Sequence, residues 1–211
     1  MPTSPNDTYT SPLASRNASP EMLGLWSPRH KFTLWRRVWL AVAQAQQEVT
    51  RDRAEGPLVT GAQVGELRAA VERGISDEEI SRASTLEREL RHDVMSHVHA
   101  LGEVCPGAKP IVHLGCTSQD VVCNAELLIL REACGLVHMK ALRCVDAFAR
   151  QAERWKALPT LGFTHYQPAQ PTTVGRRAAG WGHDVLISAE AVSLARGRVR
   201  LRGLRGATGT Q

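Results

Sequence analysis

The chain has 211 residues, of which 43% are hydrophobic and 22% are charged, and its net charge is +5. This composition is typical of a soluble globular protein with one large core or two smaller ones. No apolar run reaches the roughly 18–20 residues of a membrane helix, and the Pro-, Ser- and Thr-rich start lacks the apolar part of a secretory signal, so we expect a cytoplasmic protein.

The first half of the chain is expected to be helical after a polar arm. Residues 1–29 contain many prolines and predict an extended arm that is disordered at its tip. Residues 31–49 carry tryptophans and valines at helical spacing, which predicts a helix whose tryptophans pack in a core. A short helix is expected at 63–72. Another begins after Ser76, and its apolar stripe continues to Leu101 and ends at Cys105-Pro106-Gly107.

The second half predicts two long helices. Ser118 is a candidate N-cap for a helix from about Gln119 to Trp155, and a second helix is expected from Thr173 to about Leu204. The connection between them contains Pro159, Pro168 and Pro171 and predicts a stiff loop, and no strand-rich region is expected. Two long helices joined by a tight loop are typical of an antiparallel helical hairpin.

These elements indicate an all-α fold. We expect three parts: an extended polar arm over residues 1–29, an amino-terminal helical domain over 30–117, and part of a long-helix bundle over 118–211.

Cysteine, histidine and arginine usage indicates neither a metal nor a nucleic acid. An odd number of cysteines without a CxxC pair predicts free thiols. His92, His97 and His99 do not share one helical face, which argues against a metal site. Arginines crowd the last residues without interleaved aromatic side chains, so we favour a solvated helix end over a nucleic-acid surface; they are Arg196, Arg198, Arg200, Arg202 and Arg205.

Three motifs combine side chains that suit acid–base chemistry and anion binding. Their sequences are Arg91-His92-Asp93, His113-Leu114-Gly115-Cys116-Thr117-Ser118, and Thr164-His165-Tyr166-Gln167-Pro168. Histidine transfers protons near neutral pH, although most loop histidines are merely solvated. A helix start with Thr117 and Ser118 offers N–H groups and hydroxyls to an anion, or only an N-cap. Arg91, on the predicted helix, offers a fork for phosphate or carboxylate.

The order of these motifs, after the arm sequence Ser11-Pro12-Leu13-Ala14-Ser15-Arg16, resembles the adenylosuccinate lyases of the fumarase/aspartase superfamily. The resemblance covers most of the chain. It implies β-elimination of fumarate from adenylosuccinate, giving AMP, and from the succinylated aminoimidazole carboxamide ribotide in purine nucleotide biosynthesis. It also implies a homotetramer that needs no cofactor or metal and does not bind nucleic acid or membranes.

The resemblance also implies roles for single residues. His165 matches the general acid that protonates the leaving nitrogen, and Thr164, Thr117 and Ser118 match contacts to the substrate. Three further matches, Arg91, His92 and Asp93, belong to the nucleotide site. Arg16 matches a substrate-binding arginine that the family follows with tyrosine, whereas this chain has Asn17.

One element of the family is absent from the sequence. The serine-bearing loop of the superfamily, Ser-Ser-x-Met-Pro-x-Lys-x-Asn-Pro, does not occur, so the resemblance places the general base outside this chain. We therefore expect an amino-terminal portion that is inactive alone. Two alternatives stay open: another lyase of the superfamily, such as argininosuccinate lyase or fumarase, and a non-catalytic helical oligomerisation fragment.

Overall fold

A computed structural model describes residues 4–210, and the chain divides into two compact units. The first unit comprises Met1–Ile129 with Arg200–Gln211, and the second comprises Leu130–Val199. The two units are defined by the contacts within each of them. The three-part organisation expected from the sequence stays a prediction. The described helices include none that is both long and apolar enough to cross a membrane.

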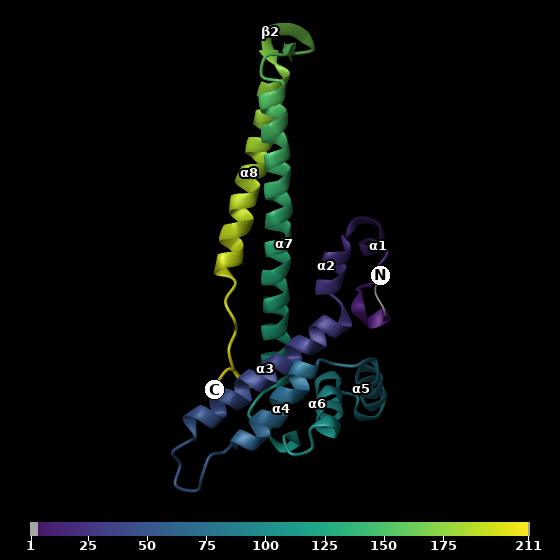
Figure 1. Cartoon of the computed structure of the whole chain (residues 1–211), viewed down its shortest axis with the longest axis vertical. Helices are drawn as coiled ribbons and strands as arrows, with labels where there is room; N and C mark the ends of the chain where they lie inside the picture. The colour runs from purple at the N-terminus through teal and green to yellow at the C-terminus, as the bar shows by residue number, and fades with distance from the viewer. Residues whose placement is uncertain (1–3, 211) are drawn as a thin grey trace. The chain divides into compact units, whose positions relative to one another are not determined.

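The amino-terminal arm contains short helices. The first unit begins with η1 (Pro5–Asp7), α1 (Ala14–Asn17) and α2 (Pro20–Leu25), which precede α3 (Pro28–Val49) (Figure 1). Serine–proline pairs start three of them: the serine hydroxyl accepts a backbone N–H, and the proline occupies the first turn, where it needs no donor. The expected extended arm is therefore wrong for these segments, because the prolines begin helices. The predicted disordered tip at 1–3 lies outside the described residues.

The arm is also fastened to the helical core. The Arg29 guanidinium bridges the carboxylates of Asp7 and Asp77. Ser4 Oγ and Asn6 Nδ2 donate to Asp77 Oδ1 at 2.7 and 2.9 Å. These contacts hold η1 against the start of α5 (Asp77–Leu90).

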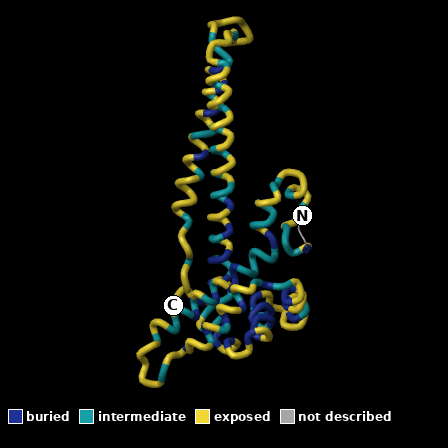
Figure 2. The backbone as a smooth tube through the Cα atoms, viewed as in Figure 1, coloured by how far each residue is buried: buried dark blue, intermediate teal, exposed yellow. Residues whose placement is uncertain are grey.

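The core of the first unit lies among α3, α4 (Gly61–Arg73), α6 (Asp93–Val104) and the start of α7 (Ser118–Arg154), which Figure 2 shows with many buried residues. Trp35 and Trp39 are 1% and 2% exposed, which confirms that they pack in a core. Capping boxes begin α4 at Thr60 and α5 at Ser76, as the Ser76 start predicted.

The apolar stripe from 80 to 101 belongs to two helices. Arg91 ends α5 in the left-handed conformation (φ 54°), and His92 becomes the N-cap of α6, where its Nδ1 accepts the Met95 N–H. The expectation that Arg91, His92 and Asp93 lie within one helix is wrong. The turn between α5 and α6 lets their apolar sides pack against each other, with Ala83, Leu86 and Ala100 buried between them.

His97 of α6 is buried, and its ring lies against that of Phe32 with centroids 3.8 Å apart. Burial, together with the charges of Arg36 and Lys31, lowers the pKa of His97 to about 4 from its ordinary 6.5. The folded state therefore holds His97 neutral, whereas the unfolded chain binds a proton more readily.

This depressed pKa predicts an acid-sensitive fold. Stability from neutral His97 is complete above pH 6.5 and should decline as the pH falls towards 4, by on the order of 2–3 kcal/mol. Urea unfolding of wild type and His97→Phe at pH 7 and pH 4.5 measures this change. His97→Phe keeps an aromatic ring and should lose less stability on acidification; an equal loss in both proteins would contradict the prediction.

The second unit consists of most of α7, a β-hairpin and α8 (Val174–Arg198). The two helices run antiparallel, as predicted (Figure 1). Glycine permits the close approach: a Cβ on Gly175 would lie 2.4 Å from the Ala152 carbonyl oxygen, and one on Gly182 would lie 2.9 Å from Phe148 Cβ.

The connection between these helices is a two-stranded antiparallel hairpin, β1 (Pro159–Thr164) with β2 (Gln167–Thr173), rather than the expected loop. The register shifts between Leu161 and Phe163, which marks a bulge. The prolines in β2 argued against a strand at the level of sequence, because proline is unusual in a strand except at an edge or a bulge.

Helix α8 ends at Arg198, short of the expected Leu204, and residues 199–210 return to the start of α7. Asn124 and Gly203 exchange hydrogen bonds of 3.0 and 3.1 Å. Asp120 accepts the backbone N–H groups of Arg205 and Gly206 at 3.0 and 3.1 Å. These contacts take the place of further helix.

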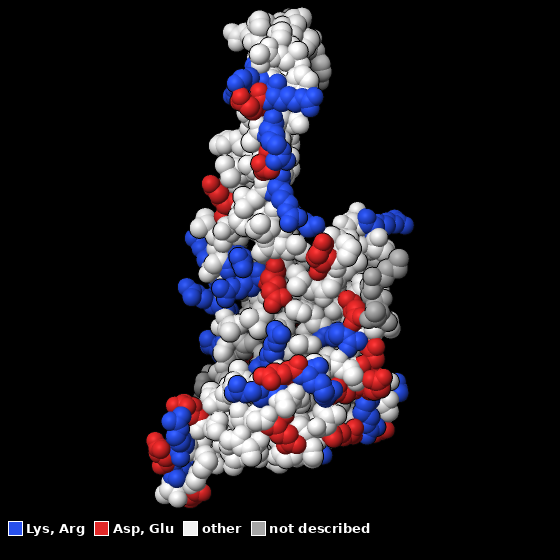
Figure 3. All heavy atoms as spheres, in the orientation of Figure 1, with Lys and Arg blue, Asp and Glu red and all other residues white. Residues whose placement is uncertain are grey.

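Charge is unevenly distributed between the units. Residues 130–199 hold ten Lys and Arg but five Asp and Glu, so this unit accounts for the whole net charge of +5. Figure 3 shows lysines and arginines along the helices of this unit.

Candidate active site

Left-handed backbone marks the motifs singled out in the sequence. Four non-glycine residues among the described ones have positive φ: Arg91, His113, His165 and Tyr166. Such conformations cost free energy for residues with a Cβ and cluster at functional sites. Each of the four lies within one of the three motifs.

His165 and Tyr166 form the turn of the β-hairpin. Thr164 pairs with Gln167, so the turn has two residues, with φ of 49° and 60°. A turn with positive φ at both positions normally takes Asn-Gly, because glycine adopts it without strain. Here an exposed imidazole and a fully exposed phenol ring stand at the tip. The imidazole of His165 is thus exposed at the tip of the β-hairpin.

His92 and Ser118 meet in the first unit. His92 Nε2 lies 3.3 Å from Ser118 Oγ, while its Nδ1 accepts the Met95 N–H at 3.4 Å. Neutral His92 therefore carries its proton on Nε2 and donates to Ser118. Asp93 Oδ1 lies 3.5 Å from Nδ1 and becomes an ion-pair partner only when His92 is protonated.

His113 is a site candidate that the sequence analysis named only within a motif. The Trp39 indole donates to its Nδ1 at 3.1 Å, which leaves the proton of a neutral ring on Nε2. Burial, with a smaller effect of nearby His92, lowers the pKa of His113. His113 is therefore held neutral, with a donor N–H on Nε2.

Asp120 holds the helix start that carries Thr117 and Ser118. It is fully buried and accepts the Thr117 N–H at 3.1 Å as well as those of Arg205 and Gly206. Burial alone would raise its pKa, but these backbone hydrogen bonds outweigh that effect and hold the pKa below its usual range. The prediction of Ser118 as N-cap is wrong by one residue: α7 begins at Ser118, Thr117 precedes it at the cap position, and the Ser118 hydroxyl lies beside His92 instead.

The predicted residues are divided between the two units. His92 and Ser118 are in contact, and Arg91 and Asp93 flank His92 in the chain. Arg16, in the last turn of α1, is an exposed side chain without a hydrogen bond or ion pair to this group within the described part of the chain. His165 and Thr164 belong to the second unit. Asp120 was missed, although its position three residues after Thr117 follows the spacing of a capping box.

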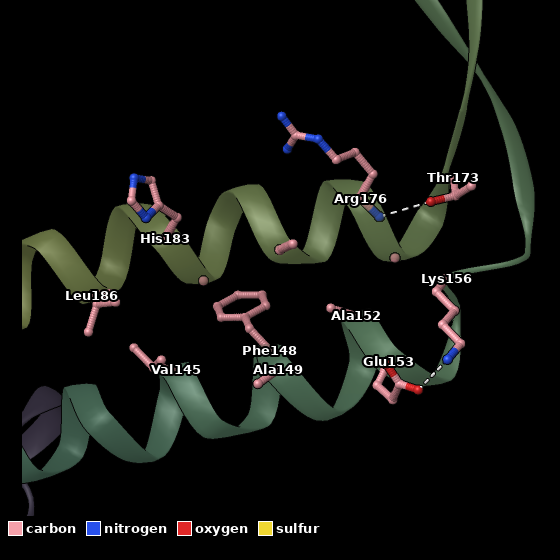
Figure 4. Close-up of a pocket in the computed structure, with 13 residues that line it drawn as sticks. Val145, Phe148, Ala149, Ala152, Glu153, Lys156, Thr173, Arg176, His183 and Leu186 are labelled. Atoms are coloured by element: carbon pink, nitrogen blue, oxygen red, sulfur yellow. Dashed lines mark hydrogen bonds and ion pairs between the residues drawn. The ribbon is translucent and has the colours of Figure 1, made fainter.

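A groove of about 630 Å³ lies between α7 and α8 near the base of the β-hairpin (Figure 4). Its floor contains Val145, Phe148 and Leu186, and its lining includes none of the predicted site residues. The residues that the structure describes contain no cluster of three or more His, Cys, Asp or Glu suited to a metal ion.

Known proteins match the chain over nearly its whole length. A family model described as Lyase matches residues 15–211. The adenylosuccinate lyase of Saccharomyces cerevisiae is 43% identical over 205 residues, which are 97% of this chain and 41% of that protein. The adenylosuccinate lyase of Schistosoma mansoni is 39% identical over 206 residues, with the same shares.

Solved structures show the same fold. A fumarate lyase from Mesorhizobium sp. BNC1 superposes with a TM-score of 0.78 at 23% identity, covering 90% of this chain and 43% of that chain. The chain thus spans less than half the length of the curated relatives it matches. The helical fold and the resemblance to adenylosuccinate lyases are confirmed, and the chain belongs to the lyase family whose model it matches.

Proposed function

We propose that this chain is part of an adenylosuccinate lyase of purine nucleotide biosynthesis, which releases fumarate from adenylosuccinate and from the succinylated aminoimidazole carboxamide ribotide. The observation that carries the proposal is the similarity to the yeast lyase over 97% of the chain, which includes all three motifs. The elimination breaks a C–H and a C–N bond. A base takes the proton on carbon, an acid protonates the departing nitrogen, and the electron pair of the C–H bond becomes the fumarate double bond.

His165 is the proposed acid. Its exposed position in the strained turn of the β-hairpin suits a group that delivers a proton to a bound substrate. Thr164 is adjacent and exposed, and its hydroxyl can donate to a substrate carboxylate. The positive charge of the second unit favours the approach of the polyanionic substrate.

The first unit supplies the proposed anion contacts. Thr117 and Ser118 stand at the start of a 37-residue helix, where hydroxyls and the helix dipole favour a carboxylate. Arg91, held in a left-handed turn, and His92 beside Ser118 are proposed to bind the nucleotide, together with Asp93 and the exposed Arg16 of α1.

We further propose that the enzyme works without a cofactor or metal, because the elimination needs only proton transfers. A homotetramer is proposed from the exposed apolar side chains on the long helices, including Val137, Met139, Trp181, Ile187 and Leu194. A cytoplasmic location suits the free thiols of all five cysteines. Neither a nucleic acid nor a membrane is a proposed partner.

A chimera tests the proposed function. Residues 1–211 are joined to the part of the yeast lyase that this chain does not cover, and fumarate release from adenylosuccinate is followed by absorbance. We expect fumarate from the chimera and none from residues 1–211 alone, since the serine-bearing loop is absent. Light scattering on the same samples reports the oligomeric state.

Each outcome of this assay separates the alternatives. A folded chimera that cleaves argininosuccinate or hydrates fumarate, but leaves adenylosuccinate intact, would identify another lyase of the superfamily. A folded, oligomeric chimera without lyase activity would support the non-catalytic fragment.

A further inference from the structure

Strand β1 pairs with β2 on one side, and its other edge has no neighbouring strand among the described residues. The Val174 N–H donates to the Leu158 carbonyl at 3.0 Å, which makes this pair a hydrogen-bonded one. Hydrogen-bonded and non-hydrogen-bonded pairs alternate in an antiparallel ladder, so the Leu161–Pro171 pair is non-hydrogen-bonded. Pro171 therefore forfeits no ladder bond, and the Leu161 carbonyl points away from β2.

Arg177 of α8 reaches this outward carbonyl. Its Nη2 donates to the Leu161 oxygen at 2.7 Å. The contact lies directly before the bulge at Gly162, where a Cβ would come within 3.0 Å of the Gln170 carbonyl oxygen. The guanidinium thus joins the helix to the strand at the place where the ladder is irregular.

The β-hairpin has little else to fix its direction. Two isolated strands are marginally stable in water, and most of both strands is exposed. At the base, Gly175 N–H donates to the Trp155 carbonyl at 3.0 Å, and Thr173 Oγ caps the Arg176 N–H. These contacts fix the start of α8 at the base of the β-hairpin. They do not reach the bulge at Gly162 or the turn at the other end of the strands.

We propose that Arg177 is a positioning residue, which holds β1 against α8 and so sets the direction in which the hairpin turn presents His165. The inference rests on the proposed function for its catalytic meaning. Arg177 does not touch the reacting atoms. It acts through the Leu161 carbonyl, four residues before His165 in the strand that leads to the turn.

Arg176 is a matched control. It precedes Arg177 in the same turn of α8 and carries the same charge. Figure 4 shows its side chain directed away from α7, and only its backbone N–H takes part in the Thr173 cap drawn there. Arg176→Ala and Arg177→Ala therefore remove equal charge, but only Arg177→Ala removes the contact to β1.

The first test uses residues 1–211 and NMR. Amide exchange of Thr164 and Gln167, the pair that flanks the turn, should be about fivefold to tenfold faster in Arg177→Ala than in wild type, the loss expected for one hydrogen bond of typical strength. The His165 ring signal should shift in the same variant. Arg176→Ala should match wild type, and Arg177→Lys, which keeps a donor, should restore part of the protection. Equal exchange and His165 signals in Arg176→Ala and Arg177→Ala would overturn the proposal.

The second test uses the chimera described above. Arg177→Ala should lower kcat about tenfold with KM within about twofold, because misdirection of His165 affects the transition state rather than binding. A fall no larger than that of Arg176→Ala, or a change confined to KM, would overturn the positioning role. An inactive wild-type chimera counts against the proposed function alone, and the NMR comparison then decides whether Arg177 orients the turn.

Discussion

Replacement of His165 by alanine in the chimera is expected to lower kcat by about 10²–10⁴-fold with little change in KM. A general acid acts mainly in the transition state, where the bond to the leaving nitrogen breaks and negative charge would otherwise develop there. Alanine cannot supply this proton. Steady-state kinetics of fumarate release, at substrate concentrations on both sides of KM, measure both parameters.

His183→Ala is the matched control for this prediction. His183 is another exposed histidine of the second unit, on α8 beside the groove, and is not a proposed site residue. It should leave kcat within about twofold, since surface substitutions have small effects. A His165→Ala loss that appears only in KM would make His165 a binding residue instead of an acid.

Replacement of Asp120 by alanine should destabilise the first unit by roughly 3–6 kcal/mol. The change leaves three backbone N–H groups without their acceptor, those of Thr117, Arg205 and Gly206. An unsatisfied buried donor costs about 1–3 kcal/mol. Urea unfolding of residues 1–211, followed by tryptophan fluorescence, measures the loss, because Trp35 and Trp39 lie in the same unit.

Asp146→Ala provides the comparison. Asp146 is an exposed α7 residue paired with Arg150, and surface ion pairs contribute about 0–1 kcal/mol. Because the pKa of Asp120 is lowered on folding, its stabilisation is present above the ordinary aspartate pKa and disappears as the pH falls through the folded value. Equal stability of the two variants at pH 7 would contradict the account of Asp120.

Local signals predicted the helices well. Ser76 begins α5 through a capping box, and the spacing of Trp35 and Trp39 correctly placed both in the core. The long helices around 119–155 and 173 onward were also identified. Such features depend on residues within one or two helical turns of each other, so they can be predicted from the local sequence.

The misses depend on contacts that are distant in the sequence or on strained backbone. The β-hairpin was hidden by prolines that occupy edge positions, and nothing in Thr-His-Tyr-Gln predicts a turn that normally takes glycine. The end of α8 was misplaced because Asn124 and Asp120, some 80 residues earlier, bind residues 203–206 in place of further helix. The break between α5 and α6 depends on Arg91 in the left-handed conformation, which helix propensities do not predict for arginine.

The contacts of residues 203–206 with Asp120 and Asn124 have a consequence for synthesis of the chain on the ribosome. Asp120 and Arg205 are separated by 85 residues, and the whole second unit is synthesised between them. During translation the buried carboxylate has no partner from this segment until the helical hairpin has left the ribosome. The buried apolar core of the first unit consists of residues 34–129 and can form earlier, but the hydrogen bonds of Asp120 and Asn124 to residues 203–206 are completed last. A ribosome that stops before Gly203 would release a chain that contains every residue of the amino-terminal core, yet leaves Asp120 and Asn124 without these hydrogen-bond partners.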